Sequence, residues 1–94
     1  MGEAAAVVRR HVFVSGQVQG VFFRDHAREM AVDNRVAGWV RNLGDGRVEA
    51  VFEGPEAAVE RLVKWCHYGP PRARVHGVMA LAEEPVGEAG FRIR

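Results

Sequence analysis

The sequence has 94 residues, of which 48% are hydrophobic and 27% are charged. This length favours a single compact domain, and the high apolar fraction together with a formal net charge of only +1 excludes an intrinsically disordered chain. The near balance of 13 basic and 12 acidic residues argues against a dedicated DNA- or RNA-binding protein, whose surface is usually strongly basic.

The cysteine content and the hydropathy pattern indicate where the protein works. Cys66 is the only cysteine, which excludes a disulfide framework, and a lone thiol favours a cytoplasmic location. No run approaches the ~18 uninterrupted apolar residues of a membrane span, so we expect no membrane contact. Residues 1–8 lack the basic and apolar regions of a signal peptide. We expect a flexible N-terminal tail over residues 1–8, a single domain over residues 9–94, and a monomer.

The first part of the chain predicts a strand, a loop and a helix. Val12 and Val14 lie in an alternating pattern that starts near residue 9 and is typical of a strand. A loop with two glycines follows over residues 15–20. A helix is expected from about Phe22, because apolar residues then recur at helical spacing. The helix is expected to end at residues 34–35, with Asn34 in the left-handed conformation.

The middle of the chain predicts a hairpin. Residues 36–41 favour a second strand, residues 43–46 a tight turn, and residues 47–53 a third strand. In this third strand Phe52 lies on an apolar face, whereas the face with Glu49 and Glu53 is expected to be largely solvated.

The last part predicts a second helix and two strands. Pro55 is expected at the first helical position, and residues 68–71 should end the helix. Over residues 74–81 a strand is expected, with its apolar face formed by Val75, Gly77, Met79 and Leu81. Residues 91–93 predict a short last strand.

This order, β-α-β-β-α-β with a short extra C-terminal strand, determines the expected fold class. Each helix has one apolar stripe, and both stripes can be buried against one face of a single sheet. The prediction is therefore an α+β, ferredoxin-like sandwich with one antiparallel sheet and two helices packed on one of its faces.

The loop before the first helix is the first candidate site. Glycines allow the backbone N–H groups of residues 16–21 to converge, and the following helix N-terminus favours an anion. Arg24 lies in the first helical turn, where its guanidinium could hold two phosphate oxygens. The alternative is an ordinary loop followed by a surface arginine in an intrahelical ion pair. The loop is not a nucleotide-binding P-loop, because no Gly-Lys-Ser/Thr follows it.

Asn42, at the end of the second strand, is the second candidate. Its side-chain amide can hold a water molecule in a defined orientation, but it could instead help to shape the hairpin turn with Asp45 and Gly46. Histidines with paired ligand spacing and a carboxylate pair for acid–base chemistry are both lacking, and Cys66 falls on an apolar helical stripe. We therefore expect no metal ion and no cofactor.

Two longer motifs change the weight of these candidates. They are Val14-Ser15-Gly16-Gln17-Val18-Gln19-Gly20-Val21-Phe22-Phe23-Arg24 and Gly38-Trp39-Val40-Arg41-Asn42-Leu43-Gly44-Asp45-Gly46-Arg47-Val48-Glu49. Together they resemble the two signatures of the acylphosphatase family, and the likeness extends over residues 9–94.

The resemblance implies metal-independent hydrolysis of small acyl phosphates to a carboxylate and inorganic phosphate. It makes Arg24 the phosphate-binding arginine and Asn42 the residue that positions the attacking water. The backbone of the phosphate-binding loop would be supplied by Gly16, Gln17, Val18, Gln19, Gly20 and Val21. The sequence departs from the family at residues 34–35, where a glycine is common.

Two other functions remain open at this point. A non-catalytic phosphate- or metabolite-binding module would need the Arg24 cradle but not Asn42. An RNA-recognition-type sheet would need exposed aromatic residues on central strands, for which Phe13 and Phe52 are the candidates, and basic flanks that the charge balance does not supply. We expect a small-molecule acyl phosphate as the substrate, inorganic phosphate as a product, and no nucleic acid as a partner.

Overall fold

The computed structural model describes residues 6–94. The strands are β1 Val7–Gln17, β2 Ala37–Asn42, β3 Val48–Pro55, β4 Arg74–Glu83 and β5 Phe91–Ile93. The helices are α1 Phe23–Asp33 and α2 Glu56–Cys66. The predicted order of elements is confirmed.

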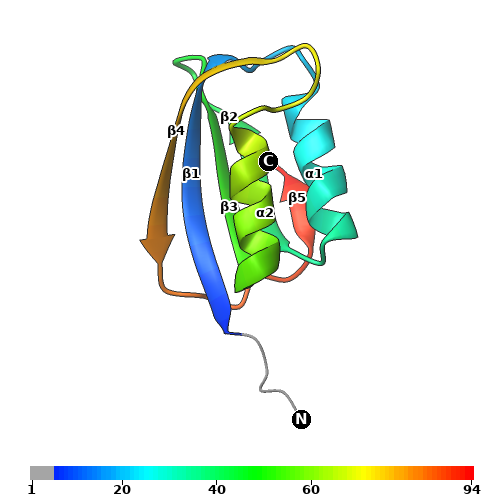
Figure 1. The fold of residues 1–94 in the computed structure, drawn as a ribbon, viewed down its shortest axis with the longest axis vertical. Helices are drawn as coiled ribbons and strands as arrows, with labels where there is room; N and C mark the ends of the chain where they lie inside the picture. Colours follow the sequence, from blue (N-terminus) through cyan, green and yellow to red (C-terminus); the bar gives the residue numbers. More distant parts are fainter. Residues whose placement is uncertain (1–5) are drawn as a thin grey trace.

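The strands form one sheet in the order β4-β1-β3-β2-β5, and both helices cover the same face of it (Figure 1). The four longer strands pair antiparallel, which confirms the ferredoxin-like α+β arrangement. However, β5 pairs parallel with β2, so the prediction of a purely antiparallel sheet is wrong at this edge. The chain after β4 crosses one end of the sheet to the opposite edge, and it therefore enters β5 in the direction of β2 (Figure 1).

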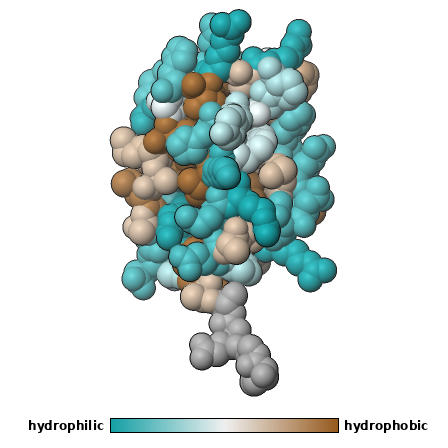
Figure 2. Space-filling model, viewed as in Figure 1, coloured by the Kyte–Doolittle hydropathy of each residue, from teal (hydrophilic) through white to brown (hydrophobic). Residues whose placement is uncertain are grey.

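The hydrophobic core fills the space between the sheet and the two helices. Its buried side chains alternate along β1 and β3 and recur along one stripe of each helix; they include Val12, Val14, Phe23, Ala27, Val48, Phe52, Val59, Leu62 and Cys66. Burial of one such large side chain contributes about 1.5–3 kcal/mol. On the face that carries the helices, hydrophilic side chains cover most of the surface, with apolar ones visible between them (Figure 2).

The first strand begins earlier than the sequence pattern indicates. Val7 and Val8 pair with Pro55 and Gly54 of β3, and Val8 packs against the core. The predicted tail over residues 1–8 is therefore wrong at its last two residues, because these residues extend the ladder. Residues 1–5 of that tail lie outside the described residues.

The end of α1 differs from the prediction in which residue is left-handed. Arg35 has φ 57°, whereas Asn34 has φ −97° and donates from its side chain to the carbonyl of Met30 (2.8 Å). The amides of Arg35 and Val36 bond back to the carbonyls of residues 32 and 31 (3.1 and 2.8 Å), which is a Schellman cap. Its geometry assigns the left-handed conformation to the residue that follows Asn34.

The apolar face expected for β4 is also wrong. Met79 and Leu81 are 55% and 45% exposed, while Val75 and Val78 pack against the core. The register shifts between Ser15 and its neighbour in β1, so one residue of β4 is skipped. A bulge of this kind reverses the alternation of faces along the strand.

The start of α2 also differs from the prediction. Pro55 is extended (ψ 138°) and precedes α2 rather than forming its first residue.

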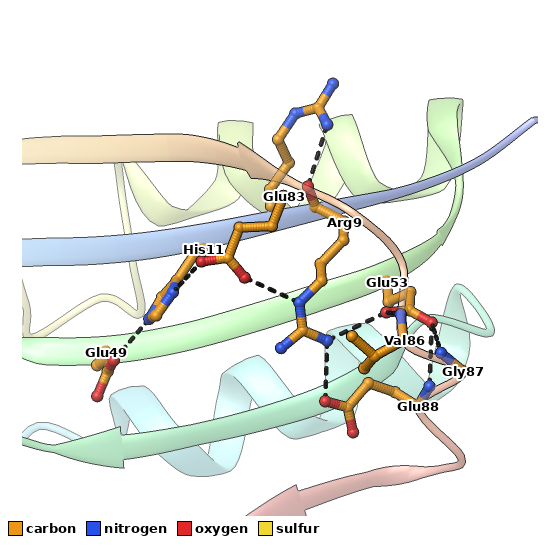
Figure 3. Close-up of polar contacts among 9 residues, drawn as sticks. Arg9, His11, Glu49, Glu53, Glu83, Val86, Gly87 and Glu88 are labelled. Carbon is orange, nitrogen blue, oxygen red and sulfur yellow. Dashed lines mark hydrogen bonds and ion pairs between the residues drawn. The ribbon is translucent and has the colours of Figure 1, made fainter.

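The sheet face away from the helices carries a network of charged side chains, here called the open-face network (Figure 3). Its members are Arg9, His11, Glu49, Glu53, Glu83 and Glu88. The Arg9 guanidinium contacts three carboxylates at 2.9–3.1 Å, and both ring nitrogens of His11 contact carboxylates at 2.6 and 2.7 Å.

Because these long side chains cover one another, Glu49 and Glu53 are each only 5% exposed, and the prediction of a solvated face is wrong. Burial acts to raise the pKa of Glu49, but hydrogen bonds from His11 and Arg41 outweigh it and hold this pKa below its usual value. Burial likewise acts to raise the pKa of Glu53, but bonds from the Val86 amide and the Arg9 guanidinium, among others, lower it.

Candidate active site

Two loops that carry the predicted site residues meet at the same end of the sheet. Strands β1 and β2 both pair antiparallel with β3, so they run in the same direction and end at the same edge. The loop after β1, residues 18–22, leads into α1, and the turn after β2, residues 43–47, leads into β3. Both lie at the upper end of the molecule in Figure 1.

The backbone of the first loop presents unpaired donors. Gly20 (φ 74°) and Phe22 (φ 66°) both have left-handed backbone conformations. Among residues 6–94, no backbone carbonyl accepts a hydrogen bond from the amides of residues 18–25, and the first amide with such a partner is that of His26, which donates to the Phe22 carbonyl (3.1 Å). Amides of a turn that runs into a helix N-terminus form a concave anion site.

Arg24 adds a full positive charge to this loop. It lies in the first turn of α1 and is half-buried. No carboxylate of residues 6–94 forms an ion pair with its guanidinium. The alternative of an intrahelical ion pair is therefore not what the structure shows, and the five N–H donors of this side chain are available for a ligand.

Asn42 is the last residue of β2. Its Oδ1 atom is buried and accepts no hydrogen bond from residues 6–94. The hairpin turn is held by other bonds, from the Leu43 amide to the Arg47 carbonyl (2.8 Å) and from Arg47 to the carboxylate of Asp45 (2.9 and 3.1 Å). The large majority of buried acceptors in folded proteins have partners, so the hydrogen-bonding capacity of this oxygen is available to a ligand or a water molecule.

One pocket of about 230 Å³ brings these groups together. It is lined by Val18, Gly20, Phe22, Phe23, Arg24, Asp25 and Asn42. Arg24 and Asn42 thus come from different elements, 18 positions apart in the sequence, and share one cleft.

The family of the chain follows from comparison with known proteins. A family model for acylphosphatase matches residues 10–93, which is nearly the whole chain. The chain belongs to the acylphosphatase family. It is 58% identical to an acylphosphatase of Natronomonas pharaonis over 93% of this chain and 95% of that relative. It is 59% identical to an acylphosphatase of Rubrobacter xylanophilus over 100% of this chain and 86% of that relative.

A solved structure agrees with this assignment. An acylphosphatase from Coxiella burnetii is similar to the chain with a TM-score of 0.90 and 40% sequence identity, covering 94% of this chain and 93% of that one. The chain is therefore an enzyme of the acylphosphatase family, and the family and the fold together support the hydrolysis of acyl phosphates.

The loop residues expected to bind phosphate divide into three groups. Val18 and Gly20 line the pocket. Gly16 and Gln17 are instead the last residues of β1 and pair with β4, where a Cβ atom on Gly16 would lie 2.2 Å from a backbone oxygen of β4. Val21 packs at the edge of the core. Of the six residues expected to form the phosphate-binding loop, only Val18 and Gly20 therefore line the cleft of this acylphosphatase-family enzyme.

Two functional features escape the sequence pattern. The side chain of Gln19 donates to the carbonyls of Leu43 (2.7 Å) and Arg47 (2.9 Å), so it ties the loop of residues 18–22 to the hairpin that carries Asn42. A glutamine in a loop does not reveal from the sequence alone that its side chain will bond to a second loop. Phe22 lines the pocket and has a left-handed backbone conformation. Outside Gly, Asn and Asp this conformation is uncommon, so a phenylalanine in the sequence does not indicate it.

The other groups considered for chemistry lie elsewhere. Cys66 is fully buried in the core, and burial raises the pKa of its thiol. Within residues 6–94, no three His, Cys, Asp or Glu side chains are grouped so as to hold a metal ion. None of the helices in this range is long and apolar enough to cross a membrane. Phe52 stacks on Phe91 inside the core (ring centroids 5.8 Å apart), so it is not the exposed aromatic that an RNA-binding sheet would need.

Proposed function

We propose that this pocket hydrolyses small acyl phosphates by direct attack of water on the phosphoryl group, without a metal ion. The observation that carries the proposal is the single cleft that joins Arg24, Asn42 and the unpaired loop amides. Inorganic phosphate and a carboxylate are the products.

The chemistry of the substrate explains why so few groups are needed. The leaving group is a carboxylate, which departs without taking up a proton, so a general acid is dispensable. What remains is to hold the phosphoryl group, to neutralise its charge and to aim the nucleophile, which are the main requirements of phosphoryl transfer.

Each group then has one task. The amides of the 18–25 segment and the guanidinium of Arg24 hold the phosphoryl oxygens. The Oδ1 atom of Asn42 accepts a hydrogen bond from a water molecule in line with the bond from phosphorus to the acyl oxygen. As the water oxygen bonds to phosphorus, that bond breaks and its electron pair leaves with the carboxylate. The proton of the water passes to a phosphoryl oxygen of the substrate.

The proton acceptor can be tested at Asp25, whose carboxylate also lines the pocket. If a phosphoryl oxygen takes the proton, replacing Asp25 by Asn does not cause the ~10²–10⁴-fold loss of kcat that is typical of a lost general base. A loss of that size in Asp25→Asn, with unchanged folding, would make Asp25 the base instead.

Steady-state hydrolysis of benzoyl phosphate tests the roles of Arg24 and Asn42. Loss of one preorganised charge-stabilising donor costs about 10²–10³ in rate, so Arg24→Ala is expected to lose at least that much and to weaken inhibition by inorganic phosphate. Asn42→Ala should lower kcat strongly while the inhibition constant of phosphate stays nearly unchanged. Near-native turnover of Asn42→Ala would contradict the water-positioning role.

Arg28→Ala is the matched control for Arg24→Ala. Arg28 is exposed on the same helix, one turn further along, and does not line the pocket. Its removal changes the net charge by the same amount, but its side chain does not line the pocket and a charge exposed to water interacts only weakly with other charges, so it should leave kcat/KM within about twofold of the parent enzyme.

The same assay in EDTA tests metal independence. Activity that EDTA abolishes and magnesium restores would overturn the mechanism. Phosphate binding without turnover would favour a non-catalytic binding module.

A monomer in the cytoplasm remains a prediction, and sedimentation velocity at micromolar concentration tests the monomeric state.

A further inference from the structure

Phe22, which lines the pocket, combines two unfavourable features. Its backbone lies in the left-handed region (φ 66°, ψ 25°), directly before the first residue of α1. A side chain with a Cβ adopts this conformation only at a cost, and a bulky aromatic residue is an outlier there. The residue is also 59% exposed to water. Strained residues of this kind concentrate at functional sites.

The composition of the pocket indicates what such a ring could contact. Arg24 and Asn42 supply the polar groups, and the neighbouring apolar side chains of Val18 and Phe23 are only 1% and 2% exposed. Of the side chains that line the pocket, Phe22 is thus the only one that is both apolar and exposed.

The size of the pocket places the acyl group near this ring. Its volume of about 230 Å³ lies below the ~300–1,000 Å³ of typical small-molecule sites. A phosphoryl group held by Arg24 and the loop amides leaves little enclosed space, so the acyl group extends toward the solvent-exposed part of the lining, whose apolar residue is Phe22.

We propose that Phe22 contacts the acyl group and gives the enzyme a preference for acyl phosphates with an apolar, above all aromatic, acyl group. This inference rests on the proposed function. An aromatic acyl group can stack on the exposed ring, whereas an acetyl group offers one methyl. Phe22 is a specificity residue in this scheme and takes no part in bond breaking.

The test is the ratio of kcat/KM for benzoyl phosphate to kcat/KM for acetyl phosphate. A partly exposed apolar contact contributes to discrimination at the lower end of the range for hydrophobic pockets, so Phe22→Gly should lower this ratio about five- to tenfold. Phe22→Asn should lower it equally, and Phe22→Leu should retain most of it. Gly and Asn both tolerate the left-handed conformation, so these variants keep or improve the local backbone.

The ratio separates specificity from damage to the fold. A loosened loop would slow both substrates and leave the ratio unchanged, and an unchanged ratio in Phe22→Gly and Phe22→Asn would overturn the inference. The inhibition constant of inorganic phosphate, which lacks an acyl group, measures separately any change in the phosphate-binding loop to which the Phe22 amide belongs.

A binding measurement keeps this inference distinct from the proposed function. Benzoylphosphonate and acetylphosphonate carry the same acyl groups but cannot be hydrolysed at a P–O–acyl bond. If the parent enzyme hydrolyses neither acyl phosphate, the proposed function fails. The inference then stands if benzoylphosphonate binds more tightly than acetylphosphonate and Phe22→Gly removes the difference in Kd, and it fails if the variant keeps that difference.

Discussion

Replacing Glu53 by Gln is expected to lower the free energy of unfolding by about 2–3 kcal/mol. One carboxylate oxygen accepts from the Arg9 guanidinium (3.1 Å) and the Val86 amide (3.0 Å), and the other from the amides of Gly87 (2.8 Å) and Glu88 (3.0 Å). In the variant one oxygen becomes an NH₂ group, which confronts two donors. Each orphaned donor costs about 1–3 kcal/mol, and the value falls at the low end because the Val86 segment borders water.

Thermal and urea unfolding followed by circular dichroism at pH 7 measures this loss. For a domain of this size the midpoint temperature should fall by roughly 10–20 °C. The matched control is Glu60→Gln, because Glu60 contacts Arg10 at 3.7 Å with its side chain 57% exposed, and exposed pairs contribute at most about 1 kcal/mol. A Glu53→Gln variant as stable as the Glu60→Gln control would refute the reasoning, because it would show that water replaces these bonds without cost.

Three further outcomes follow from the structure. The pKa values of Glu49, Glu53 and Glu83 lie below the usual 4.5 in the folded state. The stability that these three carboxylates contribute is therefore fully present above about pH 5 and is lost as the pH falls through the folded pKa values. Urea unfolding between pH 7 and pH 3 measures this loss, and a free energy of unfolding that does not change with pH would contradict it. Arg35→Gly should raise stability by about 0.5–1 kcal/mol because glycine accepts φ 57° without strain, whereas Asn34→Gly, at φ −97°, should not. Gln19→Ala removes both bonds to the hairpin and should cost about 1–3 kcal/mol as well as lowering kcat, since Asn42 adjoins that hairpin; unchanged kcat would show that Asn42 holds its position without the bridge.

The sequence predicts this fold well where the spacing of apolar residues and the residue types of a turn determine the structure of a single segment. The stripe at Phe23 and Ala27 identifies α1, and the alternation in β3 identifies the strand behind the core. The differences arise where distant segments meet. The direction of β5 depends on the path of the chain around the sheet, and the face of β4 depends on a bulge opposite Gly16, and local pattern encodes neither.

The candidate site divides in the same way. Arg24 and Asn42 could be identified by their residue types and their motifs, and the parallel directions of β1 and β2 explain why they share a pocket. The bridging role of Gln19 and the exposed ring of Phe22 depend on atoms that come together only in three dimensions. Glu53 shows the same limit. The alternation of polar residues in β3 predicts that its carboxylate is solvated, but other charged side chains bury it.

The position of Cys66 has a practical consequence. It is the only thiol in the sequence, it lies fully enclosed between α2 and the sheet, and burial disfavours its reactive thiolate form. A thiol-specific reagent can therefore label the protein only when the interior opens. The rate of labelling reports the fraction of open molecules in native buffer, so the native cysteine serves as a probe of stability, and each variant above can be ranked without denaturant and without an engineered labelling site.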